Sequence, residues 1–371
     1  MNTEENWFLV KEAGQIDSPA LLLYPERIRH NIREMVRVAG APGRLRPHIK
    51  THKMAEIIRM QQEAGIDKFK CATLAEAELL GQCGALDVLV AYPLTGPAPL
   101  RLTELQRKYP ETRFSCLVDH PDTLAALETA ARETDTRPGV YLDLNVGMNR
   151  TGISPGQEAV DLYTGMVSSD TLDCRGLHVY DGHLRNPDPN QRKEDCDRAF
   201  EGVERLASRL REAGMQVPAI IAGGSPTFPI HARREGIELS PGTTLLWDAR
   251  YGQQFPEMPF LPAAALLCRV ISKPAPGTLC LDLGHKAVAA EMDFPRVFLP
   301  QIPDNTQVGQ SEEHLVLQCE EAGRLPIGTE LYAIPMHICP TVIKYPEALV
   351  VQEGAVTGRW QVAARDYHLA D

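Results

Sequence analysis

The stretch Arg46-Pro47-His48-Ile49-Lys50-Thr51-His52-Lys53 contains the first side chain whose chemistry could define a function, the amine of Lys50. It lies at the end of a predicted strand over residues 45–50 and follows an amphipathic run over residues 25–39. A lysine amine can form a Schiff base with an aldehyde, and burial lowers its pKa towards a reactive value. Most lysines of a folded protein are solvated surface charges, so Lys50 by itself predicts no cofactor.

A glycine-rich turn, Gly223-Gly224-Ser225-Pro226-Thr227, follows an apolar run over residues 218–223. Gly223 and Gly224 allow the backbone to approach an anion, and the hydroxyl of Ser225 adds a donor. In a barrel of parallel strands the loops after the last two strands commonly bind phosphate, although ordinary turns share this composition. Together with a lysine that can bind an aldehyde, the turn predicts pyridoxal 5′-phosphate as the cofactor.

Two further clusters follow predicted strands. Arg150 lies in a glycine-containing loop after the run 139–145, and a guanidinium facing a pyridine nitrogen keeps that nitrogen unprotonated because it donates but cannot accept. His178 and Tyr180 share one face of the predicted strand 174–180, where Tyr180 can pack against or bond to the cofactor. His183, just past that strand, is a candidate acid or base. A surface arginine and structural histidines are the competing interpretation.

A candidate metal site lies far along the chain, in Pro335-Met336-His337-Ile338-Cys339-Pro340-Thr341. Alternate residues of a strand point to the same side, so a strand here would present His337 and Cys339 to one ion. An imidazole and a thiolate suit Zn²⁺, and two protein ligands leave positions for water and substrate. A histidine and a cysteine buried in the core are the alternative.

The order of the elements indicates how these residues are positioned. Helical segments alternate with strand-like runs, a pattern typical of an α/β fold with a (β/α)8 barrel. A doubly wound open sheet is the competing architecture. Eight runs precede residue 250, at 45–50, 68–72, 87–92, 114–119, 139–145, 174–180, 218–223 and 238–245.

After residue 250 the prolines cluster and short β-rich runs replace the long helical segments. This change predicts a second, all-β domain that carries His337 and Cys339. We therefore expect an N-terminal segment over residues 1–19 that pairs with the β domain, a barrel over 20–250 and a β domain over 251–371. The apolar run 20–24 is a further candidate to pair with the β domain.

Composition limits the classes of partner. The 371 residues carry a net charge of −11, which argues against nucleic acid or an anionic membrane as the main partner. The N-terminal sequence has no signal-peptide pattern, and no apolar run reaches the length of a membrane span. Nine cysteines at irregular spacing, an odd number, indicate a reduced cytoplasmic protein without a disulfide framework.

These motifs, in this order, resemble the D-threonine aldolase and D-serine dehydratase family, which has the alanine-racemase-like fold of pyridoxal-phosphate enzymes. The resemblance extends from about residue 18 to residue 365. It implies that Lys50 holds the cofactor, that Arg150 faces its pyridine nitrogen, and that Gly223, Gly224 and Ser225 bind its phosphate. It also implies a divalent metal, zinc or manganese, on His337 and Cys339, and a homodimer in which the partner's β domain completes the active site.

The resemblance implies a lyase that acts on small D-β-hydroxy amino acids. Our first hypothesis is retro-aldol cleavage to glycine and an aldehyde, with His183 as a base. The cysteine at position 339 of the metal site resembles the motif of members that eliminate water. The segment Tyr180-Asp181-Gly182-His183 instead resembles the corresponding segment of the aldolases. The alternatives are therefore a D-serine or D-3-hydroxy-amino-acid dehydratase, an amino-acid racemase, and a pyridoxal-phosphate carrier without catalytic activity.

Overall fold

The computed structural model describes residues 6–367, which divide into two compact units. The barrel unit comprises Met35–Lys50 and Ile57–Gly242, with the end of the described chain. The β unit comprises the chain up to Glu34, with Thr51–Glu56 and Thr243–Arg365. Each unit has its own sheet, and each carries some of the predicted site residues.

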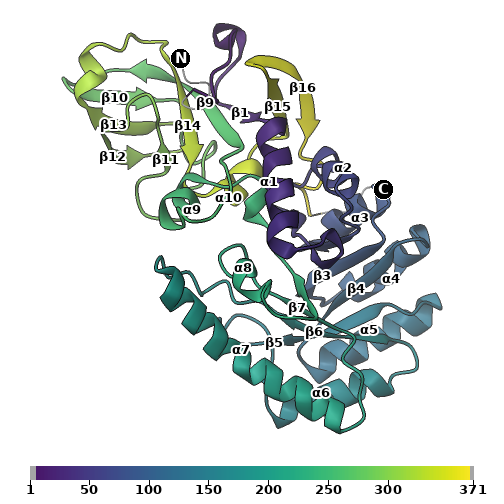
Figure 1. Ribbon diagram of the computed structural model, residues 1–371. Coiled ribbons are helices and arrows are strands. Elements are labelled where there is room, and N and C mark those ends of the chain that lie inside the picture. The colour runs from purple at the N-terminus through teal and green to yellow at the C-terminus, as the bar shows by residue number, and fades with distance from the viewer. Residues whose placement is uncertain (1–5, 368–371) are drawn as a thin grey trace. The chain divides into compact units, whose positions relative to one another are not determined.

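The barrel unit contains a parallel sheet of seven strands that pair in chain order (Figure 1). Each strand coincides with one of the predicted runs, so the alternation of strands and helices is confirmed. The strands are β2 (Lys68–Cys71), β3 (Asp87–Pro93), β4 (Arg113–Val118), β5 (Gly139–Leu144), β6 (Asp173–Val179), β7 (Ala219–Ala222) and β8 (Ile237–Leu239).

The predicted strand at 45–50 is wrong as a continuous strand. Leu45 forms an isolated parallel bridge to Leu239 of β8, and His48 forms one to Lys70 of β2. The chain then turns into the 3-10 helix η3 (Ile49–Thr51), which ends the extended conformation. Because this short segment bonds to both edge strands of the curled sheet, it fills the place of the first barrel strand.

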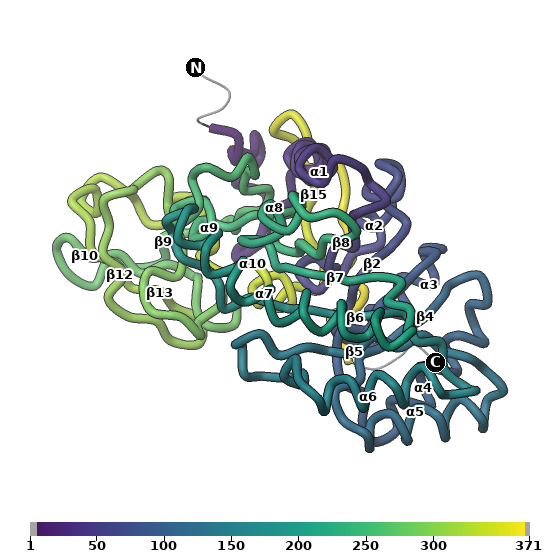
Figure 2. The backbone as a smooth tube through the Cα atoms, turned by 60° about the horizontal axis from the view of Figure 1, so that its bottom comes forward, coloured from purple at the N-terminus to yellow at the C-terminus, as the bar shows by residue number. Residues whose placement is uncertain are grey.

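Helices connect the strands and cover the outside of the sheet, as Figure 2 shows for α4 to α7. One start shows local capping: the hydroxyl of Thr73 accepts a hydrogen bond from the Glu76 amide (3.1 Å) at the beginning of the helix that follows β2. The helices wholly within the barrel unit are α3 (Leu74–Gln82), α4 (Ala98–Lys108), α5 (Pro121–Thr134), α6 (Gln157–Ser168), α7 (Pro189–Glu212) and α8 (Phe228–His231), with the 3-10 turn η2 (Pro42–Arg44). Helices α1 (Pro25–Ala39) and α2 (Ala55–Glu63) begin in the β unit and end in the barrel unit, and the 3-10 turn η1 (Ala13–Gln15) belongs to the β unit.

Charged side chains join the edges of the barrel sheet. The buried guanidinium of Arg46 donates to Asp87 on β3 (2.6 Å) and to Glu238 on β8 (2.8 Å). Lys68 on β2 donates to the same Glu238 (2.6 Å). A buried charge is tolerated only when it is paired and hydrogen-bonded, so these contacts restrict how the segment before Lys50 can lie between β8 and β2.

The β unit contains a mostly antiparallel sheet of nine strands, which confirms the β-rich second part of the predicted fold. Its helices after residue 243 are short. The elements are β1 (Ala20–Leu23), η4 (Thr243–Leu245), α9 (Ala249–Gln254), β9 (Ala264–Ser272), β10 (Thr278–Leu281), β11 (Val297–Phe298), β12 (Asn305–Gln310), β13 (Leu315–Cys319), η5 (Glu320–Gly323), β14 (Glu330–Pro335), α10 (Ile338–Val342), β15 (Glu347–Gln352) and β16 (Ala355–Gln361).

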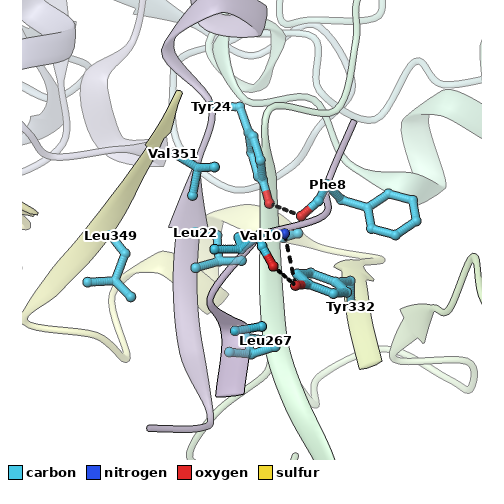
Figure 3. Packing of buried hydrophobic residues seen from close by; sticks show 10 residues of the cluster. Phe8, Val10, Leu22, Tyr24, Leu267, Tyr332, Leu349 and Val351 are labelled. Carbon is cyan, nitrogen blue, oxygen red and sulfur yellow. Dashed lines mark hydrogen bonds between the residues drawn. The ribbon is translucent and has the colours of Figure 1, made fainter. Parts of the chain in front are cut away.

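The start of the chain is built into the β unit. Strand β1 pairs with β15 in parallel and with β9 in antiparallel orientation, so residues 20–23 lie outside the barrel in which we had placed them. Leu22, Tyr24 and Tyr332 pack in one buried cluster (Figure 3). In that cluster the Val10 amide donates to the hydroxyl of Tyr332 (3.0 Å). Among residues 6–367 no helix is long and apolar enough to cross a membrane.

Candidate active site

A cavity of about 570 Å³ opens in the barrel unit beside the ends of strands β2, β3, β5 and β6. The predicted residues Lys50, Arg150 and Tyr180 all line it, and His178 lines it with them. These side chains come from three separate segments of the sequence. The fold therefore brings the candidate Schiff-base lysine, the arginine and the aromatic ring to one place.

Lys50 enters the cavity from the 3-10 turn rather than from a strand end. Its backbone amide donates to Nδ1 of His48 (3.2 Å), which lies at the bridge to β2. Its side-chain amine is 5.7 Å from the centroid of the Tyr180 ring. The turn thus fixes the position of the lysine backbone while the amine faces an aromatic ring in a half-buried environment.

Arg150 lies over the same ring, with its guanidinium carbon 5.0 Å from the Tyr180 centroid. The loop that carries it is organised by Asn145, whose side-chain oxygen accepts from the amides of Gly147 (3.0 Å) and Asn149 (3.1 Å). The amide of Gly152 closes the loop by donating to Asp119 (2.9 Å). The arginine is exposed but held above the cavity by a folded loop.

The sequence interpretation missed Lys70 and Asp143, which also line the cavity. Asp143 accepts a hydrogen bond from Nδ1 of His178 (2.7 Å), and Nε2 of His178 lies 3.4 Å from the amine of Lys70. Burial lowers the pKa of His178, against the opposing effect of Asp143. Residues two positions apart on a strand share a face, which pairs Lys70 with Lys68 and Asp143 with Tyr141 on the predicted strands. This alternation is the signal that could have identified Lys70 and Asp143 from the sequence.

His183, the predicted base, lies next to the loop that carries Arg150. A Cβ on Gly147 would sit 2.9 Å from Nε2 of His183, and Gly147 also has a φ of +117°, so this position requires glycine. Nδ1 of His183 is buried without a hydrogen-bond partner among the described residues. This nitrogen has an unused hydrogen-bonding position but is closed to solvent. His183 is not among the residues that line the cavity.

The glycine-rich turn after β7 is held from below by Asp181. One carboxylate oxygen of Asp181 accepts from the amide of Gly224 (3.1 Å) and from the hydroxyl of Thr227 (2.7 Å). The amide of Gly223 donates to the carbonyl of Val179 (3.1 Å). Both glycine amides are therefore engaged within the protein, and a phosphate here would rely on other donors of the turn. Ser225 is buried, and its hydroxyl accepts from the amide of Gly242 (3.2 Å).

Asp181, Cys196 and His231 form a buried group whose ligand-type atoms lie within 4.8 Å of one another. Nε2 of His231 donates to the second oxygen of Asp181 (2.8 Å) and is 3.4 Å from the sulfur of Cys196. Burial raises the pKa of Cys196 to about 12, so its thiol stays protonated. Because the thiolate is the form that binds metals, we interpret this group as a hydrogen-bonded support for the turn.

The cavity fits pyridoxal 5′-phosphate. It combines an amine, a guanidinium and an aromatic ring, the donor set that an aldehyde, a pyridine nitrogen and an aromatic cofactor require. The adjoining turn is open because of its glycines: a Cβ on Gly224 would approach Tyr180 to 3.3 Å. A side chain there would fill the space beside the ring.

The predicted metal residues do not lie in a strand. Strand β14 ends at Pro335, His337 caps the short helix α10, and Cys339 lies in its first turn. The alternation argument for this pair is therefore wrong. The two side chains nevertheless interact directly. Burial lowers the pKa of His337, but hydrogen bonds to Cys339 and Glu291 and the charges of Cys339 and Asp248 outweigh it and raise the pKa to about 9.

Other residues of the β unit surround this pair. The sulfur of Cys339 is 3.1 Å from the hydroxyl of Thr51 and 3.6 Å from that of Thr243. Glu291 bonds to Nδ1 of His337. Burial raises the pKa of Asp248 to about 6 although it accepts the amide of Ile338 (3.3 Å). An imidazole, a sulfur and nearby carboxylates are a donor set that fits a divalent transition metal.

Two models of known protein families match this chain. A model of the family described as alanine racemase, N-terminal domain, matches residues 24–249. The chain belongs to this family. A second model, of a D-serine dehydratase-like domain, matches residues 263–351. The two matches cover the barrel unit and most of the β unit after residue 243.

Relatives extend over nearly the whole chain. A D-threonine aldolase of Arthrobacter sp is 29% identical over 364 residues, covering 95% of this chain and 94% of that protein. The crystal structure of D-threonine aldolase from Filomicrobium marinum matches with a TM-score of 0.89 at 28% identity, covering 96% of this chain and 98% of that one. The D-threo-3-hydroxyaspartate dehydratase of Delftia sp. is 26% identical over 373 residues, covering 93% and 97%. The resemblance predicted from the motifs is confirmed.

Proposed function

We propose that the protein is a pyridoxal-phosphate- and divalent-metal-dependent lyase that cleaves D-β-hydroxy amino acids to glycine and an aldehyde. The observation that carries the proposal is the cavity that joins Lys50, Arg150 and Tyr180 in a member of the alanine racemase family. Relatives named as D-threonine aldolase and 3-hydroxy-D-aspartate aldolase support the choice of reaction.

Different residues would contact different parts of the cofactor. Lys50 binds the aldehyde, and Arg150 donates to the pyridine nitrogen. Tyr180 packs beside the ring, and Gly223, Gly224 and Ser225 form the turn for the phosphate. The bound cofactor supplies an electron-withdrawing system that stabilises negative charge on the carbon next to the amine of the substrate. His183 takes the proton of the substrate hydroxyl, which an unpartnered Nδ1 permits.

His337 and Cys339 would hold the metal, zinc or manganese, which acts as a Lewis acid for the hydroxyl of the substrate. A variant of the Delftia dehydratase in which one cysteine is replaced by alanine is known in a metal-free form. Cys339→Ala should therefore lose the bound metal, measured as metal per protein by mass spectrometry of the purified enzyme. Cys83→Ala, which changes another half-buried cysteine, is the control. Equal metal content in the two variants would contradict the assignment.

A dehydratase is the second candidate, because Cys339 at the metal pair and the Delftia relative both favour it. In that reaction the substrate loses water, and the products are a 2-oxo acid and ammonia. The alternatives of a racemase and of a carrier without catalysis need no metal site. The homodimer and the cytoplasmic location stay predictions.

Product analysis tests the reaction. The holoenzyme is incubated with D-threonine, D-3-hydroxyaspartate and D-serine, with and without a chelator, and the products are separated. We expect glycine and the matching aldehyde from the first two, and a loss of turnover with the chelator. A 2-oxo acid with ammonia would identify the dehydratase, and interconversion of enantiomers that survives chelation would identify a racemase.

A second experiment tests how the cofactor is held. Lys50→Ala should abolish the visible absorbance of the cofactor, and persistence of that absorbance would refute Lys50 as the residue that binds it.

A further inference from the structure

The cavity contains a second lysine. Lys70 belongs to β2, is 2% exposed, and lines the same cavity as Lys50. Its amine is 5.6 Å from the centroid of the Tyr180 ring, compared with 5.7 Å for Lys50. Lys68, two residues earlier on the same face of the strand, binds the carboxylate of Glu238 instead (2.6 Å). A buried lysine that forms no ion pair with a carboxylate of residues 6–367 requires an explanation.

The hydrogen bonds around Lys70 orient its amine. Nδ1 of His178 donates to Asp143 (2.7 Å), and a hydroxyl donor, Thr151, holds the other oxygen of that carboxylate (2.9 Å). With its proton on Nδ1, the neutral imidazole presents the lone pair of Nε2, which accepts from the amine of Lys70 at 3.4 Å. The chain Asp143–His178–Lys70 therefore fixes the amine without giving it a counter-charge.

The surrounding charges favour an uncharged amine. Burial, together with the charges of Lys50 and Arg46, lowers the pKa of Lys70 to about 7, against the opposing effect of Asp143 and Asp181. Arg150 adds a further positive charge at the cavity wall. Two protonated amines in one buried cavity repel each other, so one of them loses its proton readily.

We propose that Lys70 is a second catalytic amine of this cavity, which exchanges a proton with the α-carbon of the substrate. The inference rests on the proposed function. Aldol cleavage transfers one proton overall, from the β-hydroxyl oxygen to the α-carbon. When the bond between the α- and β-carbons breaks, its electron pair stays on the α-carbon, and Nζ of Lys70 donates a proton there. Nζ then regains the proton that the hydroxyl lost, through the base or the solvent.

Lys50 would hold the cofactor before the substrate amine takes its place, whereas Lys70 remains a primary amine throughout. The two lysines therefore have separable roles: removing Lys50 removes the anchor, and removing Lys70 leaves it. This difference distinguishes failure of the inference from failure of the proposed function.

The first test measures the amine itself. Full-length protein freed of cofactor is trace-labelled with acetic anhydride, which reacts with uncharged amines, and each lysine is quantified by mass spectrometry over a pH series. Lys70 should reach half-maximal labelling near pH 7, well below an unstructured lysine peptide added to the same mixture, whose amine has a pKa of about 10.4. Labelling of Lys70 in step with that peptide would overturn the proposal.

The second test follows proton transfer in the holoenzyme. Exchange of the α-protons of glycine in deuterated buffer is measured by NMR for Lys70→Met, Lys70→Arg and the control Lys68→Met. Lys70→Met and Lys70→Arg should each lose about 100-fold in exchange rate, because a thioether has no proton and a guanidinium does not release one. Both should keep the cofactor absorbance of the wild type. Lys68→Met should exchange like the wild type.

Each outcome decides a separate point. Exchange preserved in Lys70→Met or Lys70→Arg would overturn the catalytic role of Lys70. Lost exchange together with lost absorbance in these variants would also overturn it, since Lys70 would then support cofactor binding. No absorbance and no turnover in the wild type would reject the proposed function, and the labelling titration would still report on Lys70. Thermal melting of Lys70→Met no lower than that of the wild type would show that the variant folds.

Discussion

Three buried basic side chains lie within three positions of Lys50 in the sequence, and each is held by a different neighbour. His48 accepts the amide of Lys50 (3.2 Å), His52 accepts the amide of Met54 (3.1 Å), and Lys53 donates to the carbonyl of Ala364 (3.3 Å). These bonds shape the backbone on both sides of the lysine. At the scale of single residues, the neutral state of His52 follows from its burial.

His52 should make the protein sensitive to acid. Burial lowers its pKa to about 3, so the folded state keeps it neutral, whereas the unfolded chain protonates it below its usual pKa near 6.5. Its stabilising contribution is present above pH 6.5 and is lost as the pH falls towards 3. Between pH 6.5 and 5 the free energy of unfolding should decrease by about 2 kcal/mol from this group alone.

The measurement is urea unfolding of wild type and His52→Asn at pH 7.5 and pH 5. Asparagine retains an acceptor for the Met54 amide but does not titrate, so the variant should lose less stability between the two pH values. The same change at the exposed His285 should leave the pH dependence of the wild type intact. An identical pH dependence in His52→Asn and wild type would rule out this cause.

At the scale of elements, the loops after the strands are rigid because buried carboxylates and amides support them. The turn after β7 depends on Asp181, which sits at the end of β6 and accepts from the turn and from His231. Asp181 stays ionised: burial raises its pKa, but the hydrogen bonds and charge of His231, with Thr227, lower it overall. These hydrogen bonds fix the turn that we propose for the phosphate.

Asp181→Asn should therefore weaken cofactor binding. The amide has one acceptor oxygen where the carboxylate has two, so either Gly224 or His231 loses its partner. Loss of a hydrogen bond to a charged group costs about 1.5–3 kcal/mol, or roughly 10- to 100-fold in affinity if the loss falls on the bound state. Titration with pyridoxal phosphate, followed by fluorescence, measures this. Asp170→Asn, on an exposed aspartate, is the control. Unchanged affinity in Asp181→Asn would mean that the turn does not bind the phosphate.

At the scale of the whole molecule, the chain contributes to the β unit at its beginning and at its end. Strand β1 lies between β9 and β15, so residues more than 240 positions apart in sequence are direct neighbours: Leu22 opposes Ala265 and Leu349. The β unit that carries His337 and Cys339 cannot complete its sheet without the first strand. The stability of the sheet beside His337 and Cys339 is thus coupled to packing at the start of the chain.

Leu22→Ala should lower the stability of the β unit. Leu22 is 0% exposed, and truncation of a buried leucine leaves a cavity that costs about 2–5 kcal/mol. Urea unfolding, monitored by circular dichroism, measures the loss of stability. In the same titration the purified variant should lose its metal at a lower urea concentration than the wild type. Val308→Ala, at a residue 48% exposed, should change stability little. Equal midpoints for the two variants would refute the role of this strand.

The sequence alone determined the strand and helix order, the change to a β-rich second part, and the motifs around Lys50, Arg150, Tyr180 and His337. These features depend on local pattern: period-2 runs, capping residues and turn glycines act over a few residues. For the same reason the sequence left residues 20–24 open between the barrel and the β domain, since an apolar run is compatible with several sheets. It also misassigned the segments before Lys50 and at His337, where short turns replace the expected strands.

Only the tertiary structure decided which side chains share the cavity. Lys70 and Asp143 look like ordinary strand residues in the sequence, and the fold sets both beside His178. Glu291 and Asp248, which set the electrostatics of His337, lie 46 and 89 positions before it. Burial, pairing and charge depend on residues that are distant in the chain. The reactive groups Lys50, Arg150, Tyr180 and His337 could therefore be identified from the sequence, whereas hydrogen-bond partners and protonation states could be assigned only from the folded structure.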